Sequence, residues 1–429
     1  MIRNILLVFL LITSIAVSAQ RTNSSPYSFF GAGEEFKPFT VEQSSMGGIG
    51  VAFSHYKYLN FTNPAAYGNL KYTTYSFGML NNRLTIDNGT DKQSSNSTSL
   101  SYFTLGIPLG SKAGMSVGIQ PVSSVGYSLS DTMLDSDGEI SEISLYSGEG
   151  GVSRVYGSFG IKVFKDFSIG IEAGYSFGNV ENSISNQIAN VSLSTQYKEV
   201  TLVKGSSVTI GTQYKKELKN KLIVSGGATV KLGNDLKVTG DDYLYSLTFS
   251  SSGTEFPRDT ISQNTISGNY NFPLKTTIGA GLGKYDKWYV GLEYEKQEAI
   301  EVSGFLNTSN AAYKYGDSNR FSLGGYFLPK INSISSYWER VTYRAGLRFE
   351  KTGLLVDGSG LNTNFTPIDD FGMSFGLGLP MKQLSSLNLG FEFGKRGTTN
   401  NSLIQENYFN FRLSLSLTDV NWFQKRKID

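Results

Sequence analysis

The strongest constraint on the fold of this chain is an alternation of apolar with small or polar residues, which starts near residue 70 and continues almost to the end. The clearest case lies at 409–417, where Phe409, Phe411, Leu413, Leu415 and Leu417 alternate with asparagine, arginine and serine. Successive side chains of a β-strand point to opposite faces, so a period of two indicates strands with one apolar face. The chain is therefore expected to be an antiparallel β-protein.

Fourteen such segments can be marked, and the connections between them alternate strictly between long and short. The expected strands are 70–80, 97–110, 115–129, 149–164, 167–182, 198–214, 222–237, 266–283, 288–303, 319–328, 339–355, 368–380, 386–396 and 406–418. The short connections are 111–114, 165–166, 215–221, 284–287, 329–338 and 381–385. Long outer loops, short periplasmic turns and an even strand number are typical of outer-membrane barrels. The sequence therefore predicts an all-β fold, a 14-stranded antiparallel transmembrane β-barrel over 70–418.

The two faces of the expected strands suit a barrel wall in a membrane. One face is rich in Leu, Ile, Val and Phe, and the other carries Gly, Ser and Asn with scattered charges, as expected for a wet or plugged lumen. The charged residues expected to face the lumen are Glu172, Glu293, Arg344, Arg348, Glu392 and Arg412. Because carboxylates and guanidinium groups form strong charge-assisted hydrogen bonds, we expect salt-bridged contacts with a plug in preference to a substrate site.

The N-terminus has the features of an export signal. Arg3 supplies the positive charge, residues 5–17 form a short apolar run, and Val17-Ser18-Ala19 fits signal peptidase, so residues 1–19 are interpreted as a signal peptide. A membrane-spanning helix needs about 20 apolar residues, and no later stretch of the sequence offers them. An exported chain with amphipathic strands is expected in the outer membrane of a Gram-negative cell.

Composition argues against several classes of function. The formal net charge of +2 gives no electrostatic case for nucleic-acid binding. The chain has no cysteine, which excludes disulfides, zinc–thiolate sites and a lipid anchor on an N-terminal cysteine. Its one histidine, His55, cannot form a multi-histidine metal site and lies away from any nucleophile motif. We therefore expect no metal, no cofactor and no enzymatic activity.

Residues 20–69, between the signal peptide and the first expected strand, show neither a strand nor a helix period. The segment 44–67 is rich in glycine and aromatic residues. The backbone groups of such an irregular segment lack regular partners in water and would find them inside a barrel. We interpret it as a plug, or hatch, with its N-terminal side in the periplasm. The residues expected to form its functional part are Met46, Gly47, Gly48, Gly50, Asn63, Pro64 and Ala65.

The glycine-rich run Met46–Ala52 and the Asn63-Pro64-Ala65 turn resemble the N-terminal hatch of the FadL/TodX-like outer-membrane transporters of long-chain fatty acids and other hydrophobic compounds. The resemblance covers the architecture of the whole mature chain, but its motifs are confined to the hatch. It implies passive uptake of hydrophobic small molecules, of fatty-acid or aromatic type, gated by the hatch. It also implies release through a lateral opening in the wall beside a kinked third strand.

Pro121 lies in the middle of the expected third strand. Proline lacks the N–H that a strand ladder needs, so it belongs at an edge or a bulge. Two interpretations stay open at this point: an ordinary bulge, or a lateral gap in the barrel wall.

The function also stays open between two classes of protein. The first is a hydrophobic-compound channel in contact with outer-membrane lipid. The second is a non-transporting accessory or structural subunit of an outer-membrane protein secretion or barrel-assembly complex, which would bind other envelope proteins. The C-terminal tail, 419–429, carries Trp422, Phe423 and a basic cluster and is either a solvated periplasmic tail or a docking peptide. The outer loop at Asp135–Glu139 is either solvated or an ion site.

Overall fold

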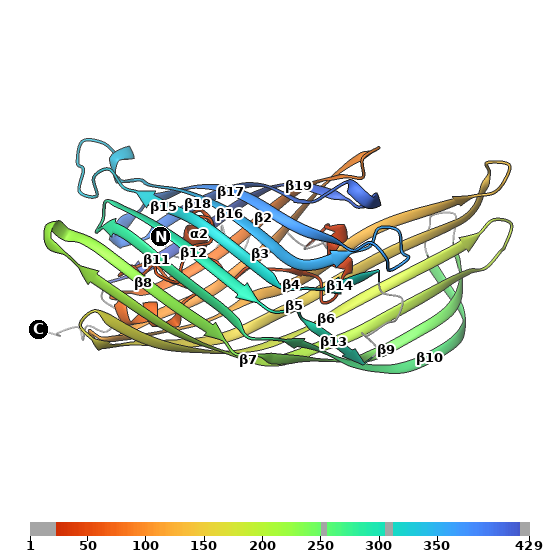
Figure 1. Ribbon diagram of the computed structural model, residues 1–429, viewed down its shortest axis with the longest axis horizontal. Coiled ribbons are helices and arrows are strands. Elements are labelled where there is room, and N and C mark those ends of the chain that lie inside the picture. Colours follow the sequence, from red (N-terminus) through yellow and green to blue (C-terminus); the bar gives the residue numbers. More distant parts are fainter. Residues whose placement is uncertain (1–22, 250–254, 305–311, 421–429) are drawn as a thin grey trace, which may run out of the picture.

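A computed structural model of the protein describes residues 23–249, 255–304 and 312–420. Its strands form one closed barrel with the N-terminal segment threaded through the lumen, and β19 ends at Asp419, at the end that carries the short connections (Figure 1). The interpreted signal peptide, 1–19, and the tail beyond residue 420 lie outside the described residues.

The barrel wall is made of elements β2 to β19. Their bounds are β2 Thr73–Asp87, β3 Lys92–Leu109, β4 Ala113–Leu134, β5 Ile140–Phe164, β6 Phe167–Ile188, β7 Ser194–Glu217, β8 Leu222–Lys231, β9 Asn234–Phe249, β10 Glu255–Phe272, β11 Lys275–Lys284, β12 Trp288–Gln297, β13 Glu301–Gly304, β14 Tyr313–Tyr315, β15 Ser318–Phe327, β16 Thr342–Val356, β17 Thr366–Pro380, β18 Ser386–Gly397 and β19 Gln405–Asp419. Each of the pairs β8–β9, β10–β11, β12–β13 and β14–β15 continues one strand across a short break. Counted this way, the described residues form fourteen wall strands.

All pairings between neighbouring wall strands are antiparallel, and β19 pairs with β2 from Gln405↔Asp87 to Asp419↔Thr73, which closes the barrel. The predicted fold, a 14-stranded antiparallel barrel of the outer membrane, is confirmed. The strands reach further than expected on the side of the long loops: β5 begins at Ile140 instead of 149, and β10 at Glu255 instead of 266. In these extensions apolar residues such as Ile140, Leu145, Phe256 and Ile261 are fewer and irregularly spaced, so the regular alternation that marks a strand in the sequence is lost although the hydrogen-bond ladder continues.

The wall presents apolar side chains outward and polar ones inward. Phe349, Phe375 and Phe393 are 52%, 44% and 50% exposed on the outer surface. The inward residues between them include Arg348, which is 9% exposed. Such an arrangement suits a wall whose outer surface is covered by hydrocarbon and whose lumen is filled.

Helical structure is scarce. Its pieces are η1 Pro26–Phe29, α2 Val41–Ser44, η2 Pro64–Asn69, η3 Lys219–Lys221, η4 Trp338–Arg340, η5 Lys382–Leu384 and η6 Asn400–Ser402. None of the helices among the described residues has the length and apolar character needed to cross a membrane. The first three belong to the N-terminal segment, together with the two-residue strand β1, Glu34–Glu35.

Inward-facing glycines let the N-terminal segment touch the wall. Gly160, Gly170 and Gly211 are successive cross-strand partners on β5, β6 and β7. A Cβ atom at Gly160 would lie 2.3 Å from the carbonyl oxygen of Pro64, and one at Gly170 would lie 2.4 Å from the carbonyl carbon of the same residue. The proline turn is therefore seated directly on the backbone of the wall.

This contact predicts a position-specific effect on β5. We expect Gly160→Val to displace the proline turn, because the new side chain would overlap its backbone, at a cost of about 1–3 kcal/mol. The measurement is thermal unfolding together with protease sensitivity of the N-terminal segment in the detergent-solubilised protein. The matched control is Gly157→Val on the same strand, where an added Cβ meets nothing within 4 Å. Equal behaviour of the two variants would contradict the close packing.

Candidate functional site

The barrel wall has a seam between β3 and β4. These two strands pair only from Phe103↔Ile119 to Leu109↔Ala113, next to their short connection. Beyond Ile119, β4 continues to Leu134 and pairs with β5 on its other side. The upper part of β4 therefore has one edge that does not pair with β3.

Pro121 lies where the seam begins. The ladder between β4 and β5 shifts register between Pro121↔Ser153 and Ser123↔Val152, so Val122 is the extra residue of a bulge. On the opposite strand, Gly150 and Gly151 have φ of 111° and 152°, values that glycine adopts without steric penalty. The wall therefore has a bulge at Pro121, close to the point where the pairing of β3 with β4 ends.

The hatch supplies the missing neighbour of β4. Strand β1 pairs antiparallel with β4 at Glu34↔Ser124 and Glu35↔Ser123, and the Phe36 amide donates to the Val122 carbonyl oxygen at 2.8 Å. A cavity of about 490 Å³ follows this junction and is lined by Phe36, Leu100, Pro121, Glu149 and Asn179, among others. The seam is thus closed from the inside by two residues of backbone pairing, with open space beside it.

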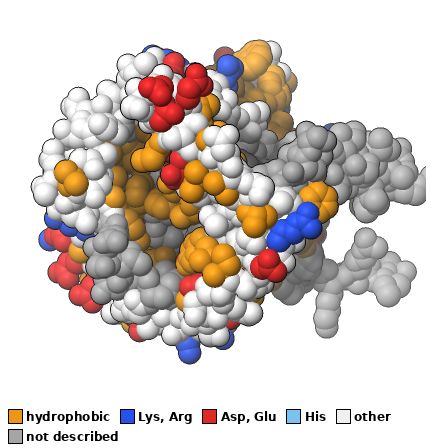
Figure 2. Space-filling view, turned by 90° about the vertical axis from the view of Figure 1, so that its right-hand side faces the viewer, with side chains coloured by type: hydrophobic (Ala, Val, Ile, Leu, Met, Phe, Trp, Pro, Cys, Tyr) orange, Lys and Arg blue, Asp and Glu red, His pale blue; other side chains and the backbone are white. Residues whose placement is uncertain are grey.

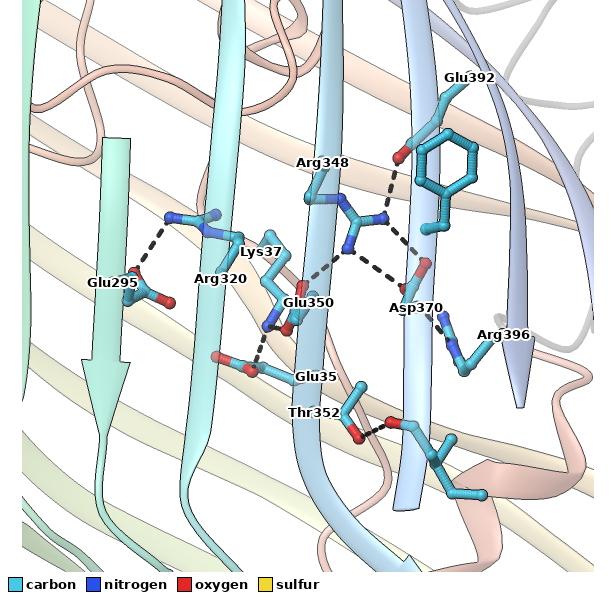
Figure 3. Close-up of polar contacts among 12 residues, drawn as sticks. Glu35, Lys37, Glu295, Arg320, Arg348, Glu350, Thr352, Asp370, Glu392 and Arg396 are labelled. Atoms are coloured by element: carbon cyan, nitrogen blue, oxygen red, sulfur yellow. Dashed lines mark hydrogen bonds and ion pairs between the residues drawn. The ribbon is translucent and has the colours of Figure 1, made fainter. Parts of the chain in front are cut away.

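Charged side chains fasten β1 to the far wall of the lumen (Figure 3). The Lys37 ammonium lies 2.6 Å from a carboxylate oxygen of Glu350 on β16 and 2.7 Å from one of Glu35. The Lys275 ammonium lies 3.2 Å from Glu35, and Arg396 pairs with Glu34. Burial opposes the charge of Lys37, but the facing carboxylates prevail and raise its pKa. Burial likewise opposes the charge of Glu35, but Lys275 and Lys37 hold its pKa well below the ordinary value.

Arg348 is the centre of the network on the wall. Its guanidinium lies 2.7 Å from Glu350, 3.3 Å from Asp370 and 3.0 Å from Glu392, and it donates to the Tyr408 hydroxyl at 2.9 Å. Figure 3 shows these groups converging from β16, β17 and β18. Two small cavities beside the hatch, of about 120 and 110 Å³, have eight and nine charged residues in their linings.

The glycine-rich run is held by one buried carboxylate. One oxygen of Glu293 accepts the amides of Gly50 and Val51, each at 2.8 Å, and the other lies 3.1 Å from Arg320. Because Glu293 is 2% exposed, these charge-assisted bonds are shielded from water.

The same run packs on the backbone of the wall. Met46 is fully buried, and its carbonyl oxygen would lie 2.1 Å from a Cβ atom at Gly324. The Gly47 amide donates to Ser374, and Gly48 has a φ of 85°, a conformation that glycine adopts readily.

The Asn63-Pro64-Ala65 turn is a helix cap locked to the wall. The Asn63 side-chain oxygen accepts the Ala65 amide at 3.0 Å and so caps η2. Its amide group donates to the Val51 carbonyl oxygen at 2.7 Å and to that of Thr212 on β7 at 3.0 Å. One side chain thus joins the turn, the glycine-rich run and the barrel wall.

The remaining predicted charges lie in the same lumen. Glu172 lies 3.1 Å from Arg154, Arg344 donates to Asn388 at 3.2 Å, and Arg412 lies 2.5 Å from Glu392. The sequence reasoning did not single out the hatch charges Glu34, Glu35 and Lys37, or Arg320 and Asp370 on the wall. Arg320 and Asp370 lie two and four positions before Ser322 and Ser374, so strand alternation places them on the same, lumen-facing side. Glu34, Glu35 and Lys37 form a charged run between aromatic residues. The sequence therefore contained a signal for each of these residues.

His55 lies at the periplasmic end of the hatch. Its imidazole is 3.5 Å from Asp286 in the turn after β11 and lies against the rings of Tyr56 and Tyr58. Burial lowers the pKa of His55 to about 4, and the hydrogen bond that its imidazole donates to Asp286 opposes this only in part, so the imidazole is neutral at neutral pH. No cluster of three or more potential metal ligands occurs in the part of the chain that the structure describes. In the outer loop, the Asp135 carboxylate accepts the amides of Asp137 and Glu139.

The N-terminal part of the hatch lies in the outer half of the lumen, contrary to the expectation that this side is periplasmic. The Tyr27 hydroxyl donates to the Ile404 carbonyl oxygen just before β19, and Tyr27 packs against Val356 and Ile368 at the same end. From there the segment runs down to Leu70. The N-terminal part lies in the outer half because β1 pairs with the part of β4 beyond Ile119, which does not pair with β3. Seen from the outer end, the barrel is hollowed at its centre, and hydrophobic side chains line the hollow (Figure 2).

Taken together, the closed wall, the hatch and the seam define the class of protein: an outer-membrane β-barrel with an internal N-terminal hatch. The chain belongs to the BamG family, whose model matches residues 1–429. No curated protein matches the chain significantly.

Several solved structures share this fold at low sequence identity. The CymD monoaromatic hydrocarbon channel is 14% identical, with a TM-score of 0.59 over 88% of this chain and 97% of that one. A FadL homologue of Pseudomonas aeruginosa is 13% identical, with a TM-score of 0.59 over 90% and 99% of the two chains. The toluene transporter TbuX of Ralstonia pickettii is 13% identical, with a TM-score of 0.56 over 90% and 98%. The FadL-like resemblance is therefore confirmed for the fold, while the matching family is BamG.

The occupancy of the seam by β1 can be tested with a disulfide. Glu35 and Ser123 face each other as a non-hydrogen-bonded pair, whose Cα atoms lie about 4.5 Å apart and so fall within disulfide range. We expect the variant Glu35→Cys with Ser123→Cys to cross-link on mild oxidation, which a gel-shift assay with and without reductant detects. The chain has no native cysteine to interfere. Glu35→Cys with Ser130→Cys, further along β4, is the control that should not cross-link, and cross-linking in both pairs would place β1 elsewhere.

Proposed function

We propose that this protein is a non-catalytic structural or accessory subunit of an outer-membrane protein complex that secretes or assembles envelope proteins. The observation that carries the proposal is the ion-paired hatch, which fills the lumen at the level of Glu35, Lys37 and Glu293. The proposal is also consistent with membership of the BamG family, a name distinct from those of the hydrocarbon channels that share the fold.

The lumen around the hatch gives an apolar solute little to bind. Ligand sites for hydrophobic molecules are mainly apolar pockets of roughly 300–1,000 Å³. The two cavities beside the hatch are about 120 and 110 Å³ and carry Arg348, Glu392, Arg154 and Glu295 in their walls. Opening a path there would separate buried ion pairs, and leaving one such charge unpaired costs about 3–5 kcal/mol. A stable plug of this kind suits a scaffold.

The proposal predicts stoichiometric partners. We expect the full-length tagged protein, extracted in a mild detergent, to co-purify with other envelope proteins at fixed ratios, measured by native mass spectrometry and quantitative proteomics. The control is an unrelated tagged outer-membrane barrel expressed at the same level. Recovery of a monomer that carries only lipid would contradict the subunit role.

A second candidate function is a channel for hydrophobic small molecules, favoured by the seam. The cavity of about 490 Å³ beside Pro121 reaches from the hatch residue Phe36 to Leu100 and Ile119 on the wall. Together with the apolar hollow at the outer end (Figure 2), it offers a route that bypasses the charged lumen and leads sideways towards the membrane. In this scheme β1 is the gate, and the substrate is of fatty-acid or aromatic type.

Uptake assays separate the two functions. If the protein is a channel, locking β1 by the Glu35→Cys, Ser123→Cys disulfide should abolish uptake of labelled oleate or toluene into proteoliposomes, and reductant should restore it. Pro121→Val should reduce the uptake by straightening β4. If the protein is a scaffold, uptake stays at the level of empty liposomes in every variant, and an uptake that the disulfide does not change would exclude β1 as the gate.

A further inference from the structure

The two ends of the barrel carry opposite charge. At the short-connection end, fourteen exposed or half-exposed basic residues lie on the turns, the adjoining strand ends and the lower hatch: Lys57, Lys71, Lys112, Lys162, Lys165, Lys215, Lys216, Lys219, Lys221, Lys284, Lys287, Lys330, Arg340 and Lys382. Five acidic residues accompany them there: Asp166, Glu217, Asp286, Glu339 and Asp419. The other described residues include 19 basic and 30 acidic ones. A chain of almost neutral net charge thus has a strongly basic periplasmic face.

These basic groups are not neutralised by the protein itself. In the lumen, Arg348, Arg320 and Lys275 each have at least two carboxylate partners. None of the fourteen periplasmic basic residues, in contrast, forms an ion pair with any residue that the structure describes. A concentration of like charge without counter-charges attracts anionic partners and repels itself.

The centre of this face lies under the lumen, away from the lipid. Lys57 belongs to the hatch and Lys71 to the link between η2 and β2, and the Lys71 amide donates to the Tyr56 carbonyl oxygen at 2.9 Å. Lys71 lies close enough to Lys162 and Lys215, on the ends of β5 and β7, for the ammonium groups to repel one another. The Lys215 ammonium donates to the Ser54 carbonyl oxygen at 2.7 Å, which fixes it against the hatch. Lipid headgroups surround a barrel at its perimeter, so a ligand that covers Lys57 and Lys71 must span the barrel mouth.

We propose that the periplasmic face, centred on Lys57 and Lys71, docks an acidic periplasmic protein. The inference deepens the proposed function by naming the surface and the charge of one partner, and only its cellular test rests on that function. Oppositely charged surfaces accelerate association and set orientation, and their attraction weakens with salt.

The surface can be tested with a defined probe. The full-length protein is placed in nanodiscs of phosphatidylcholine, and binding of fluorescent poly-L-glutamate is followed by anisotropy. We expect Lys57→Glu with Lys71→Glu to weaken binding about tenfold or more, which corresponds to ~1.4 kcal/mol. The matched control is Lys204→Glu with Lys237→Glu, two exposed, cross-strand neighbours of the outer part, which makes the same change in net charge. Retention of the folded barrel in unheated SDS verifies each variant.

Three results of this experiment would overturn the proposal. The first is no binding to the wild type at about 0.05 M salt, where screening is weak. The second is equal weakening in both variants, because net charge alone would then explain the binding. The third is loss of binding when phosphatidylglycerol replaces part of the phosphatidylcholine, because lipid headgroups would then occupy the face.

An experiment in cells tests the docking surface and the proposed subunit role independently of each other. In envelope pull-downs, we expect Lys57→Glu with Lys71→Glu to lose a partner with an acidic surface that Lys204→Glu with Lys237→Glu retains, and the wild type to release it at high salt. Partners that persist in both variants overturn the docking surface and leave the subunit role standing. A wild type without stoichiometric partners overturns the subunit role, while the probe assay still decides the surface.

Discussion

The structure depends on one interrupted strand pairing. A closed barrel normally leaves no strand edge unpaired, because each free N–H and C=O group in a membrane carries a large energetic penalty. Here β3 and β4 part after Phe103 and Ile119, and the hatch restores part of the lost pairing through β1. The ion pairs of Glu34, Glu35 and Lys37 then hold β1 against the opposite wall. The position of β1 in the lumen follows from this gap.

The same arrangement explains why the lumen is both polar and filled. β1 and the nearby Lys37 bring three charged side chains into the lumen, and each meets a countercharge on the wall, which avoids the penalty of leaving an ion unpaired there. Glu293 stabilises the glycine-rich run in a similar way, because it accepts hydrogen bonds from two backbone amides that have no partner in regular structure. The charged stretch around β1 and the glycine-rich run are thus both held by paired groups, which favours a stable plug over a loosely held lid.

Much of the architecture could be predicted from the sequence, because the period of two and the alternation of loop lengths are local signals. Glu293 and Arg348 could be assigned to the lumen from strand parity alone. The seam could not be deduced from the strand pattern, since it is the absence of a pairing between residues that each look like ordinary strand. A lateral gap at Pro121 was only one of the two interpretations that the sequence left open. β1 is only two residues long and has no period, so neither its pairing with Ser123 and Ser124 nor the height of the hatch in the lumen could be deduced. Pro121 was the one local sign of the irregularity.

The seat of the hatch on backbone glycines also bears on the order of assembly. Pro64 lies against the wall at Gly160 and Gly170, and Glu34 pairs with Arg396, 362 residues further along the chain. The N-terminal segment, which is synthesised early, thus reaches its final contacts only when β18 is in place. Contacts between residues so far apart in the chain slow folding, because a long loop must close before they form. With wall and hatch this close, the N-terminal segment must lie inside the sheet before β19 meets β2, so the barrel closes around its plug.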